Sequence, residues 1–147
     1  MKLSFSTRGW PNLSWEEMLS TACDMGFSGV EVYNLPKFST FLDGNGPFHK
    51  YQTAATVRQL REKKLEIPCF DSSCDISLPD CRLEDLYTLM EVAHNTQVPY
   101  VVCCALTEDE ETVRKHLQAL LPKAEELKVT VLLKTSGIYA DTARMRQ

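Results

Sequence analysis

Polar and charged side chains follow most of the short apolar runs in this sequence. The segment KVTVLLKTSGIYADT, residues 128–142, has a β-branched and leucine-rich run, then Lys134, then a polar turn that contains glycine. Burial at a strand end would lower the pKa of a lysine and make it a general base or a Schiff-base nucleophile, whereas a solvated lysine stays an ammonium ion. The chemistry open to Lys134 therefore depends on its surroundings.

The other candidate residues occupy corresponding positions along the earlier runs. Arg8 and Trp10 follow the first run, Glu31 and Tyr33 lie in the second, GVEVY, and Asp71 follows the third. A carboxylate between two valines is costly to bury unless it is paired or used, so Glu31 is a functional candidate. Arg8 also fits a solvated loop charge, Trp10 fits core packing, and Asp71 fits a turn-capping Asx motif. As a set, these side chains suit a small hydroxylated ligand.

The cysteines and histidines lack the spacing of a metal site. The three histidines fall in predicted helices or just before one, and the adjacent pair Cys103 and Cys104 has no neighbouring histidine to activate it. Without a secretory signal, and with enough apolar residues for a core, we expect the cysteines to be free thiols rather than three disulfides. The six are Cys23, Cys69, Cys74, Cys81, Cys103 and Cys104.

The charge balance excludes some classes of partner. Sixteen Lys and Arg residues stand against twenty Asp and Glu residues, which gives a net charge of −4 with both signs interspersed. A basic patch for nucleic acid or for an acidic membrane surface is therefore disfavoured. The N-terminal segment meets Arg8, Pro11 and two glutamates too early for a signal peptide, and no apolar run approaches the length of a membrane span. We expect a cytoplasmic protein that binds neither nucleic acid nor membrane.

Apolar runs alternate with amphipathic segments along the whole chain. The runs are too short for helices and predict strands over residues 3–6, 30–33, 65–70, 100–104 and 129–133. Helical spacing and capping residues predict helices over residues 14–26, 47–64 and 82–96, and a fourth from Thr107 to Leu127. We expect Tyr51 and Leu121 to face the core, Pro122 to kink or interrupt the fourth helix, and Asp141 to cap a fifth.

This alternation repeats every roughly thirty to thirty-five residues, which is typical of stacked βαβ units around a parallel sheet. Two architectures fit, an open doubly wound sheet and a (β/α)8 barrel. No glycine-rich phosphate-binding motif follows a strand, so nucleotide-binding versions of the open sheet are less favoured. In both architectures ligands bind at the carboxyl ends of the strands, where the candidate residues fall. The 147 residues are expected to form one domain, a little over half of the about 250 residues of a complete barrel.

Two segments carry a resemblance to a known family. KLSFSTRGWPNLSWEEMLSTACDMGFSGVEVYNL resembles the opening of the sugar phosphate isomerase/epimerase family, the xylose isomerase-like TIM barrels, in which a strand, a helix and a G-[FV]-x-G-[IV]-E strand are typical. LLPKAEELKVTVLLKTSGIYADTARM resembles the same family's fourth helix, fifth strand and following loop. The resemblance spans essentially the whole chain. It implies an α/β fold, the N-terminal portion of an incomplete (β/α)8 TIM barrel with about five parallel strands and four to five helices over residues 1–147.

The resemblance also implies a chemistry, metal-assisted proton transfer on a sugar or keto-sugar. In the family a divalent cation (Mn, Mg, Co or Zn) polarises the substrate while carboxylates move the proton next to the carbonyl. The implied ligands of the epimerase branch are a glutamate, an aspartate, a histidine and a glutamate after strands five to eight. Only the first of these positions falls in this chain, and Lys134 occupies it. An ammonium group has no acceptor and repels the cation.

We therefore expect an isomerase or epimerase of carbohydrate metabolism in the full-length parent, and a chain that is itself inactive and binds no metal. The resemblance implies that strands six to eight lie outside these 147 residues and that Lys134 stands at the position of the metal-binding glutamate. The substrate-binding residues implied are Arg8, Trp10, Glu31, Tyr33 and Asp71. An alternative is a non-catalytic half-barrel that assembles with itself or with a C-terminal half through its open sheet edges. An AP endonuclease of the same superfamily is disfavoured because that branch uses several histidine ligands after its early strands.

Overall fold

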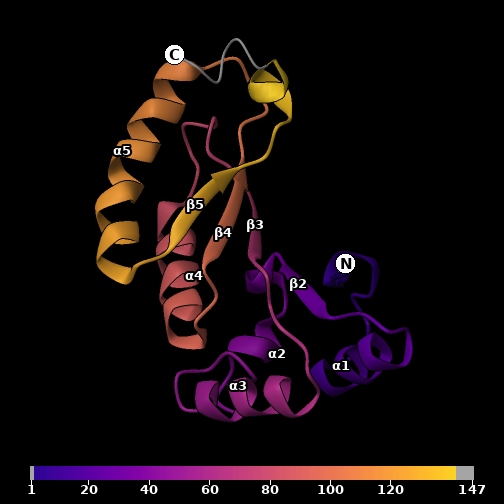
Figure 1. Ribbon diagram of the computed structural model, residues 1–147. Coiled ribbons are helices and arrows are strands. Elements are labelled where there is room, and N and C mark those ends of the chain that lie inside the picture. Colours follow the sequence, from indigo (N-terminus) through magenta and orange to yellow (C-terminus); the bar gives the residue numbers. More distant parts are fainter. Residues whose placement is uncertain (1, 142–147) are drawn as a thin grey trace.

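The computed structural model describes residues 2–141 and contains one parallel sheet with helices against one of its faces (Figure 1). The five strands lie side by side in chain order, β1-β2-β3-β4-β5, and every pairing is parallel. Their bounds are Ser4–Ser6, Gly29–Tyr33, Phe70–Asp75, Tyr100–Cys104 and Thr130–Leu133. The expected parallel α/β fold with about five strands is confirmed, and β1 and β5 are the two edges of the sheet.

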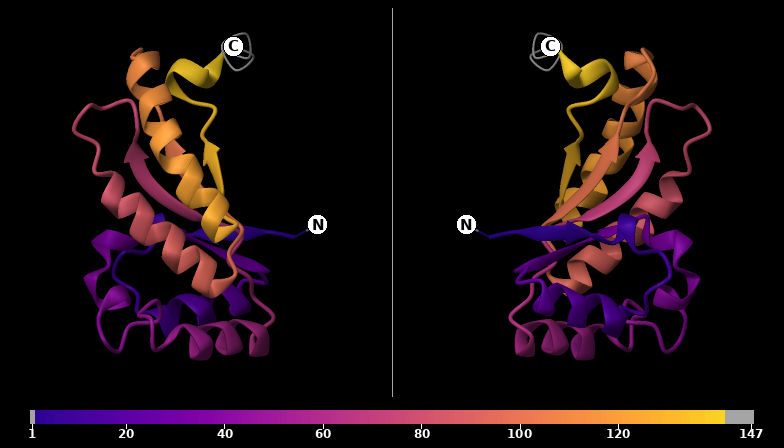
Figure 2. Two further views of the ribbon diagram at one scale, coloured as in Figure 1. Left: turned by 90° about the vertical axis from the view of Figure 1, so that its left-hand side faces the viewer. Right: turned by 90° about the vertical axis from the view of Figure 1, so that its right-hand side faces the viewer.

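The strand register separates the side chains into two faces. Val30, Val32 and Phe70 are fully buried and belong to the hydrophobic core beneath the helices. The alternate residues form a row on the opposite face, because Tyr33 pairs with Asp71, Asp71 with Val102, and Val102 with Leu132. Figure 2 shows α4 and α5 in front of the strands in one view and the strands in front in the other. The candidate residues Glu31, Tyr33 and Asp71 thus lie on the face that the helices do not cover.

Five α-helices connect the strands: α1 Trp15–Asp24, α2 Ser39–Leu42, α3 Thr53–Glu62, α4 Leu83–Thr96 and α5 Glu110–Leu127. Ser14 and Glu17 form the predicted capping box at the start of α1, with both reciprocal hydrogen bonds present. The helix α4 buries Leu86, Met90 and Ala93, as the helical spacing predicted. Amphipathic helices of this kind pack against the sheet with their apolar face.

The predicted third strand is wrong in position, because it spans 70–75 instead of 65–70. The backbone of the predicted stretch does run beside β2, since the Glu66 and Cys69 carbonyls accept hydrogen bonds from Val30 and Val32. Pro68 has no N–H group to return, so the ladder is interrupted there. The displacement puts Asp71 inside a strand rather than in the loop after it.

Three helix predictions are also corrected. The segment 47–52 forms turns, so α3 begins at Thr53, and the Tyr51 side chain is 78% exposed instead of facing the core. The fourth helix begins at Glu110 with Asp109 as its N-cap, and Leu121 is exposed. Pro122 lies inside α5 without ending it. Pro122 lacks the N–H group that would donate to the carbonyl of Gln118, an exposed residue one turn earlier. The helix expected after Asp141 lies outside the described residues.

Within residues 2–141, no helix combines the length and the apolarity that crossing a bilayer requires.

Candidate functional site

An ion pair between Lys134 and Asp71 lies at the centre of the uncovered face. Lys134 directly follows β5, and its backbone N–H still donates to the Cys103 carbonyl of β4. Its side chain crosses toward β3, where Nζ lies 2.6 Å from Oδ2 of Asp71. The Asp71 carboxylate is almost completely buried, while the Lys134 side chain is 37% exposed. The pair neutralises a buried carboxylate that would otherwise be costly.

Asp71 also caps a turn with its other oxygen. Oδ1 accepts a hydrogen bond of 2.9 Å from the Ser73 N–H, which is the Asx motif. The turn-capping alternative for Asp71 is therefore confirmed. Ser73 adopts a left-handed conformation at φ 56°, and its hydroxyl lies 2.6 Å from the Tyr33 hydroxyl. Ser73 belongs to the Asp-Ser-Ser sequence of this turn, residues 71–73.

The aromatic ring of Tyr33 lies close to two cations of the cluster. The guanidinium carbon of Arg8 lies 5.1 Å from the centre of its ring, and Nζ of Lys134 lies 5.8 Å from it. Both distances are within the range of cation–π attraction. The Tyr33 N–H donates a hydrogen bond to the hydroxyl of Thr7, in the turn directly after β1. The ring is thus close to two cations that follow the two edge strands of the sheet, β1 and β5.

Glu31 lies two residues before Tyr33 in β2, so its side chain is on the same face of the sheet, and it is half-buried. Its Oε2 atom accepts a weak hydrogen bond from the Cys69 thiol, with 3.7 Å between sulfur and oxygen. Burial and the Glu31 carboxylate raise the pKa of Cys69 to about 11. Cys69 therefore stays a neutral thiol at physiological pH and is no nucleophile there.

The state of Lys134 excludes the base and Schiff-base chemistry considered for it. Burial opposes its charge, but the hydrogen bond and the negative charge of Asp71 outweigh burial, so the pKa of Lys134 is raised. A lysine with a raised pKa remains an ammonium ion at neutral pH. It cannot then act as a nucleophile.

The described residues do not fit a catalytic divalent cation. Among residues 2–141, no group of three or more His, Cys, Asp and Glu side chains is arranged to hold a metal ion. At the strand ends the ammonium of Lys134 already uses the Asp71 oxygen that a cation would need. Metal chemistry accordingly has no donor set in the part of the chain that the structure describes.

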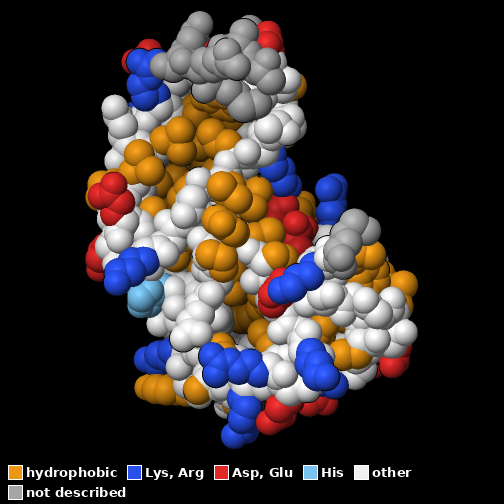
Figure 3. Space-filling model, viewed as in Figure 1, with side chains coloured by type: hydrophobic (Ala, Val, Ile, Leu, Met, Phe, Trp, Pro, Cys, Tyr) orange, Lys and Arg blue, Asp and Glu red, His pale blue; other side chains and the backbone are white. Residues whose placement is uncertain are grey.

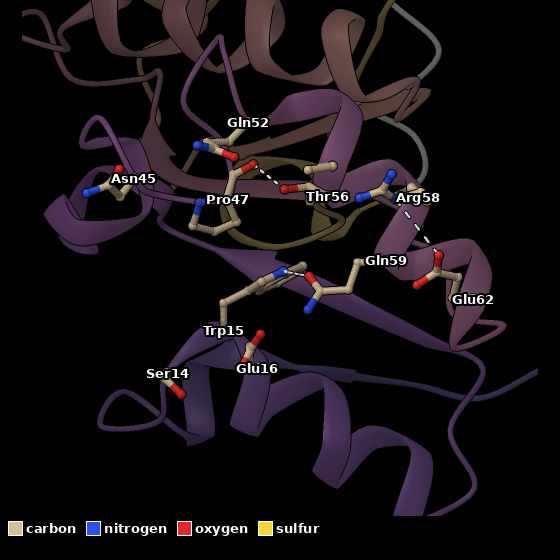
Figure 4. Close-up of a pocket in the computed structure, with 11 residues that line it drawn as sticks. Ser14, Trp15, Glu16, Asn45, Pro47, Gln52, Thr56, Arg58, Gln59 and Glu62 are labelled. Atoms are coloured by element: carbon tan, nitrogen blue, oxygen red, sulfur yellow. Dashed lines mark hydrogen bonds and ion pairs between the residues drawn. The ribbon is translucent and has the colours of Figure 1, made fainter.

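Trp10 and a groove between the outer helices belong to other surfaces. The Trp10 ring packs against Phe5 with 4.9 Å between ring centres. A groove of about 540 Å³ lies between the start of α1 and α3, where Trp15 donates a hydrogen bond to Gln59 and Arg58 pairs with Glu62 (Figure 4). Its lining side chains come from the outer helices, not from the strand ends. The cluster around Lys134 is therefore the candidate site.

Next to the charged cluster, the uncovered face is apolar. Figure 3 shows hydrophobic side chains gathered over β4 and β5. Tyr100 is 42% exposed and Leu132 is 39% exposed, although each lies in a strand. A sugar ring has both hydroxyls and an apolar face, so this combination of surfaces suits such a ligand.

Comparisons with known proteins identify the fold. No protein-family model matches the chain, and no curated protein matches it. Solved structures do match. The probable 3-DHS dehydratase AsbF from Bacillus anthracis, involved in petrobactin synthesis, has a TM-score of 0.74 and 18% identity, over 93% of this chain and 53% of that one. The IolI protein with a bound zinc atom has a TM-score of 0.70 and 18% identity, over 90% and 51%.

A third similar structure is the E. coli 3-keto-D-glucoside 4-epimerase YcjR, with a TM-score of 0.67 and 16% identity over 90% of this chain and 55% of that one. A xylose isomerase domain protein is also among the matches. The chain thus has the fold of the xylose isomerase-like TIM barrels, and it spans about half the length of the solved structures that it resembles.

Proposed function

We propose that this chain forms the sugar-binding part of a sugar isomerase or epimerase barrel and is itself inactive in metal-assisted proton transfer. The observation that carries the proposal is the 2.6 Å ion pair between Lys134 and Asp71 at the strand ends of this fold. In (β/α)8 barrels this end of the sheet is where ligands bind. In this chain the carboxylate at that end is neutralised by the ammonium group of Lys134, whereas a metal site would need free carboxylates.

The groups beside the pair support recognition of a hydroxylated ligand. Arg8 donates only, Ser73 and Tyr33 both donate and accept, and Glu31 accepts. Leu132, two residues before Lys134, offers apolar area to the ring carbons of a sugar. The solved structures of this fold include a 3-keto-D-glucoside 4-epimerase and a D-psicose 3-epimerase, which is why we infer a sugar or keto-sugar as the ligand.

Metal-assisted proton transfer belongs, in this proposal, to a longer parent protein. Further strands would supply carboxylate and imidazole ligands, and the bound cation would stabilise the developing oxyanion. We further propose a cytoplasmic location, where free cysteines such as the six of this chain persist, and no nucleic-acid partner, because the net charge is −4.

Two measurements test the proposal. The first follows solvent deuterium incorporation next to the carbonyl of a panel of ketohexoses, with the chain and each of Mn²⁺, Mg²⁺, Co²⁺ and Zn²⁺. We expect no incorporation above the metal-only control, and metal-dependent exchange would contradict inactivity. The second follows ketohexose binding by saturation-transfer NMR for the wild type, Arg8→Ala and the control Arg114→Ala, whose arginine is exposed on α5. Only Arg8→Ala should weaken binding. No binding by the wild type would exclude the sugar site.

A second candidate function is a non-catalytic half-barrel that assembles through its sheet edges. The exposure of Leu132 in the edge strand β5 favours it, because an unpaired strand with apolar side chains drives association. Light scattering at increasing concentration distinguishes the two candidates. A monodisperse monomer with a sharp unfolding transition would exclude self-assembly.

A further inference from the structure

We propose that Cys74 and Cys81 form a redox-active dithiol that closes to a disulfide by exchange with a small disulfide such as oxidised glutathione. Their sulfur atoms lie 2.8 Å apart. A disulfide bond measures about 2.05 Å, so closure needs the sulfurs to approach by less than 1 Å. All six cysteines are free in the structure, and no other sulfur–sulfur contact occurs among those of residues 2–141.

The turn between the two cysteines brings them together. Cys74 lies near the end of β3, and Cys81 lies just before α4. Between them the Leu78 N–H donates to the Asp75 carbonyl, and the Cys81 N–H donates to the Leu78 carbonyl. These two bonds fold the segment back, so that Cys81 returns to the strand that carries Cys74.

Buried anchors hold this turn against the neighbouring loop. Ser77 is fully buried, and Oδ1 of Asp75 accepts hydrogen bonds from the Ser77 N–H and hydroxyl and from the Leu106 N–H. The Ser77 hydroxyl in turn accepts a hydrogen bond from the Thr107 N–H. The thiols are therefore held in proximity by packing and by hydrogen bonds that do not involve them, which is the condition for efficient intramolecular exchange.

The exchange balances without another reactant. One cysteine thiolate attacks a sulfur of the small disulfide and releases one thiolate, and the second cysteine then attacks the mixed disulfide and releases the other. The two cysteines lose two protons and two electrons, which convert the small disulfide into two thiols. Burial raises the pKa of Cys74 and of Cys81. Formation is therefore slow at neutral pH and faster as the pH rises, and once formed the bond has poor leaving thiols and resists reduction.

Oxidation at this place would act on the candidate site through one residue. Ser73, which bonds to the Tyr33 hydroxyl and to Asp71, directly precedes Cys74. A disulfide would therefore restrain the strand end that carries Ser73. This dithiol does not depend on the proposed sugar function, because it rests on the thiol geometry alone.

The test uses the full chain in glutathione buffers of fixed oxidised-to-reduced ratio. After acid quenching and blocking of thiols with N-ethylmaleimide, endoproteinase Asp-N cuts before Asp71, Asp75, Asp80 and Asp85, which separates all three cysteines of this region. Without reduction, mass spectrometry should then detect peptides 71–74 and 80–84 joined, at a mass lower than their sum by two hydrogen atoms. The rate of joining should increase with pH.

Matched variants decide the assignment. Cys81→Ser and Cys74→Ala should abolish the joined peptides, whereas Cys23→Ser, which changes an exposed and distant cysteine, should leave them unchanged. Circular dichroism checks that each variant is folded, and the oxidised wild type should melt at a higher temperature than the reduced form. Complete blocking of both thiols in the most oxidising buffer would overturn the proposal. So would the joining of Cys74 to Cys103 or Cys104, or stable glutathione adducts without a bond between the two cysteines.

Discussion

Lys134 and Asp71 form an ion pair across an intervening strand. Asp71 lies in β3 and Lys134 follows β5, and β4 runs between them, yet Nζ lies 2.6 Å from Oδ2. Parallel strands are about 4.8 Å apart, so the lysine and aspartate side chains together span two strand spacings. The pair thus connects the middle of the sheet to its edge.

Replacing Lys134 with Met should lower the free energy of unfolding by about 2 kcal/mol, because the buried Asp71 carboxylate loses its partner. The expected loss is below the 3–5 kcal/mol of fully buried pairs because Lys134 is partly exposed. Urea unfolding measures it. The double variant Lys134→Met, Asp71→Asn should recover most of the loss. Equal stability of Lys134→Met and the wild type would contradict a stabilising pair.

The contribution of Lys134 should disappear at alkaline pH. Its folded pKa is raised above the ordinary 10.5, so its stabilisation is complete below pH 10.5 and is lost as the pH rises through the folded pKa. The difference in unfolding free energy between the wild type and Lys134→Met should therefore be constant near neutral pH and shrink above pH 10.5. A difference that shrank between pH 6 and 8 would show that another group titrates.

Lys134→Glu should be less stable than Lys134→Met, because two carboxylates would then share one buried place. A divalent cation that bridges them would relieve the repulsion. We expect Mn²⁺ to raise the melting temperature of Lys134→Glu and to leave that of the wild type unchanged, as measured by calorimetry. Lys115→Glu, at an exposed position of α5, is the control for a general effect of the added charge. A wild type stabilised by Mn²⁺ to the same extent would contradict the metal-excluding role of Lys134.

Asp75→Asn should lower the free energy of unfolding at neutral pH by about 1 kcal/mol, because charge-assisted hydrogen bonds become neutral ones. Burial opposes the charge of Asp75, but hydrogen bonds from Ser77 and Leu106 outweigh it and lower its pKa below 3.8. That stabilisation is complete above pH 3.8 and is lost as the pH falls through the folded pKa, so the two proteins should converge in acid. Asp80→Asn, an exposed change in the same turn, should have no comparable effect.

Gly137→Ala should lower the free energy of unfolding by about 2 kcal/mol. Gly137 has a φ of 61°, which is unfavourable for alanine, and a Cβ atom there would collide with the Ala105 carbonyl oxygen. Thermal unfolding measures the loss. Gly9→Ala is the matched control, since a Cβ at that position meets no atom within 4 Å. Similar melting temperatures for the two variants would contradict a close packing of the segment after β5 against the loop after β4.

Local sequence patterns determined the elements of this protein. The capping box of Ser14 and Glu17, the buried spacing of α4 and the strand Tyr100–Cys104 were all predicted, because hydrogen bonds within one turn or alternation within one strand specify them. The alternation of strands and helices also predicted the parallel sheet. Two local predictions failed. The helical spacing was continued to Tyr51, into a segment that forms turns, and the third strand was predicted before Pro68, whereas it forms after that residue.

The contacts of the candidate site were decided by tertiary structure alone. Sequence position put Lys134 and Asp71 at strand ends, but which residues face each other across parallel strands depends on register, which no local interaction specifies. The same is true of the Tyr33 and Ser73 hydroxyls, which meet only after the sheet forms. The sequence by itself therefore determined a lysine at the end of the fifth strand, and the fold determined that it is an ammonium ion paired with Asp71.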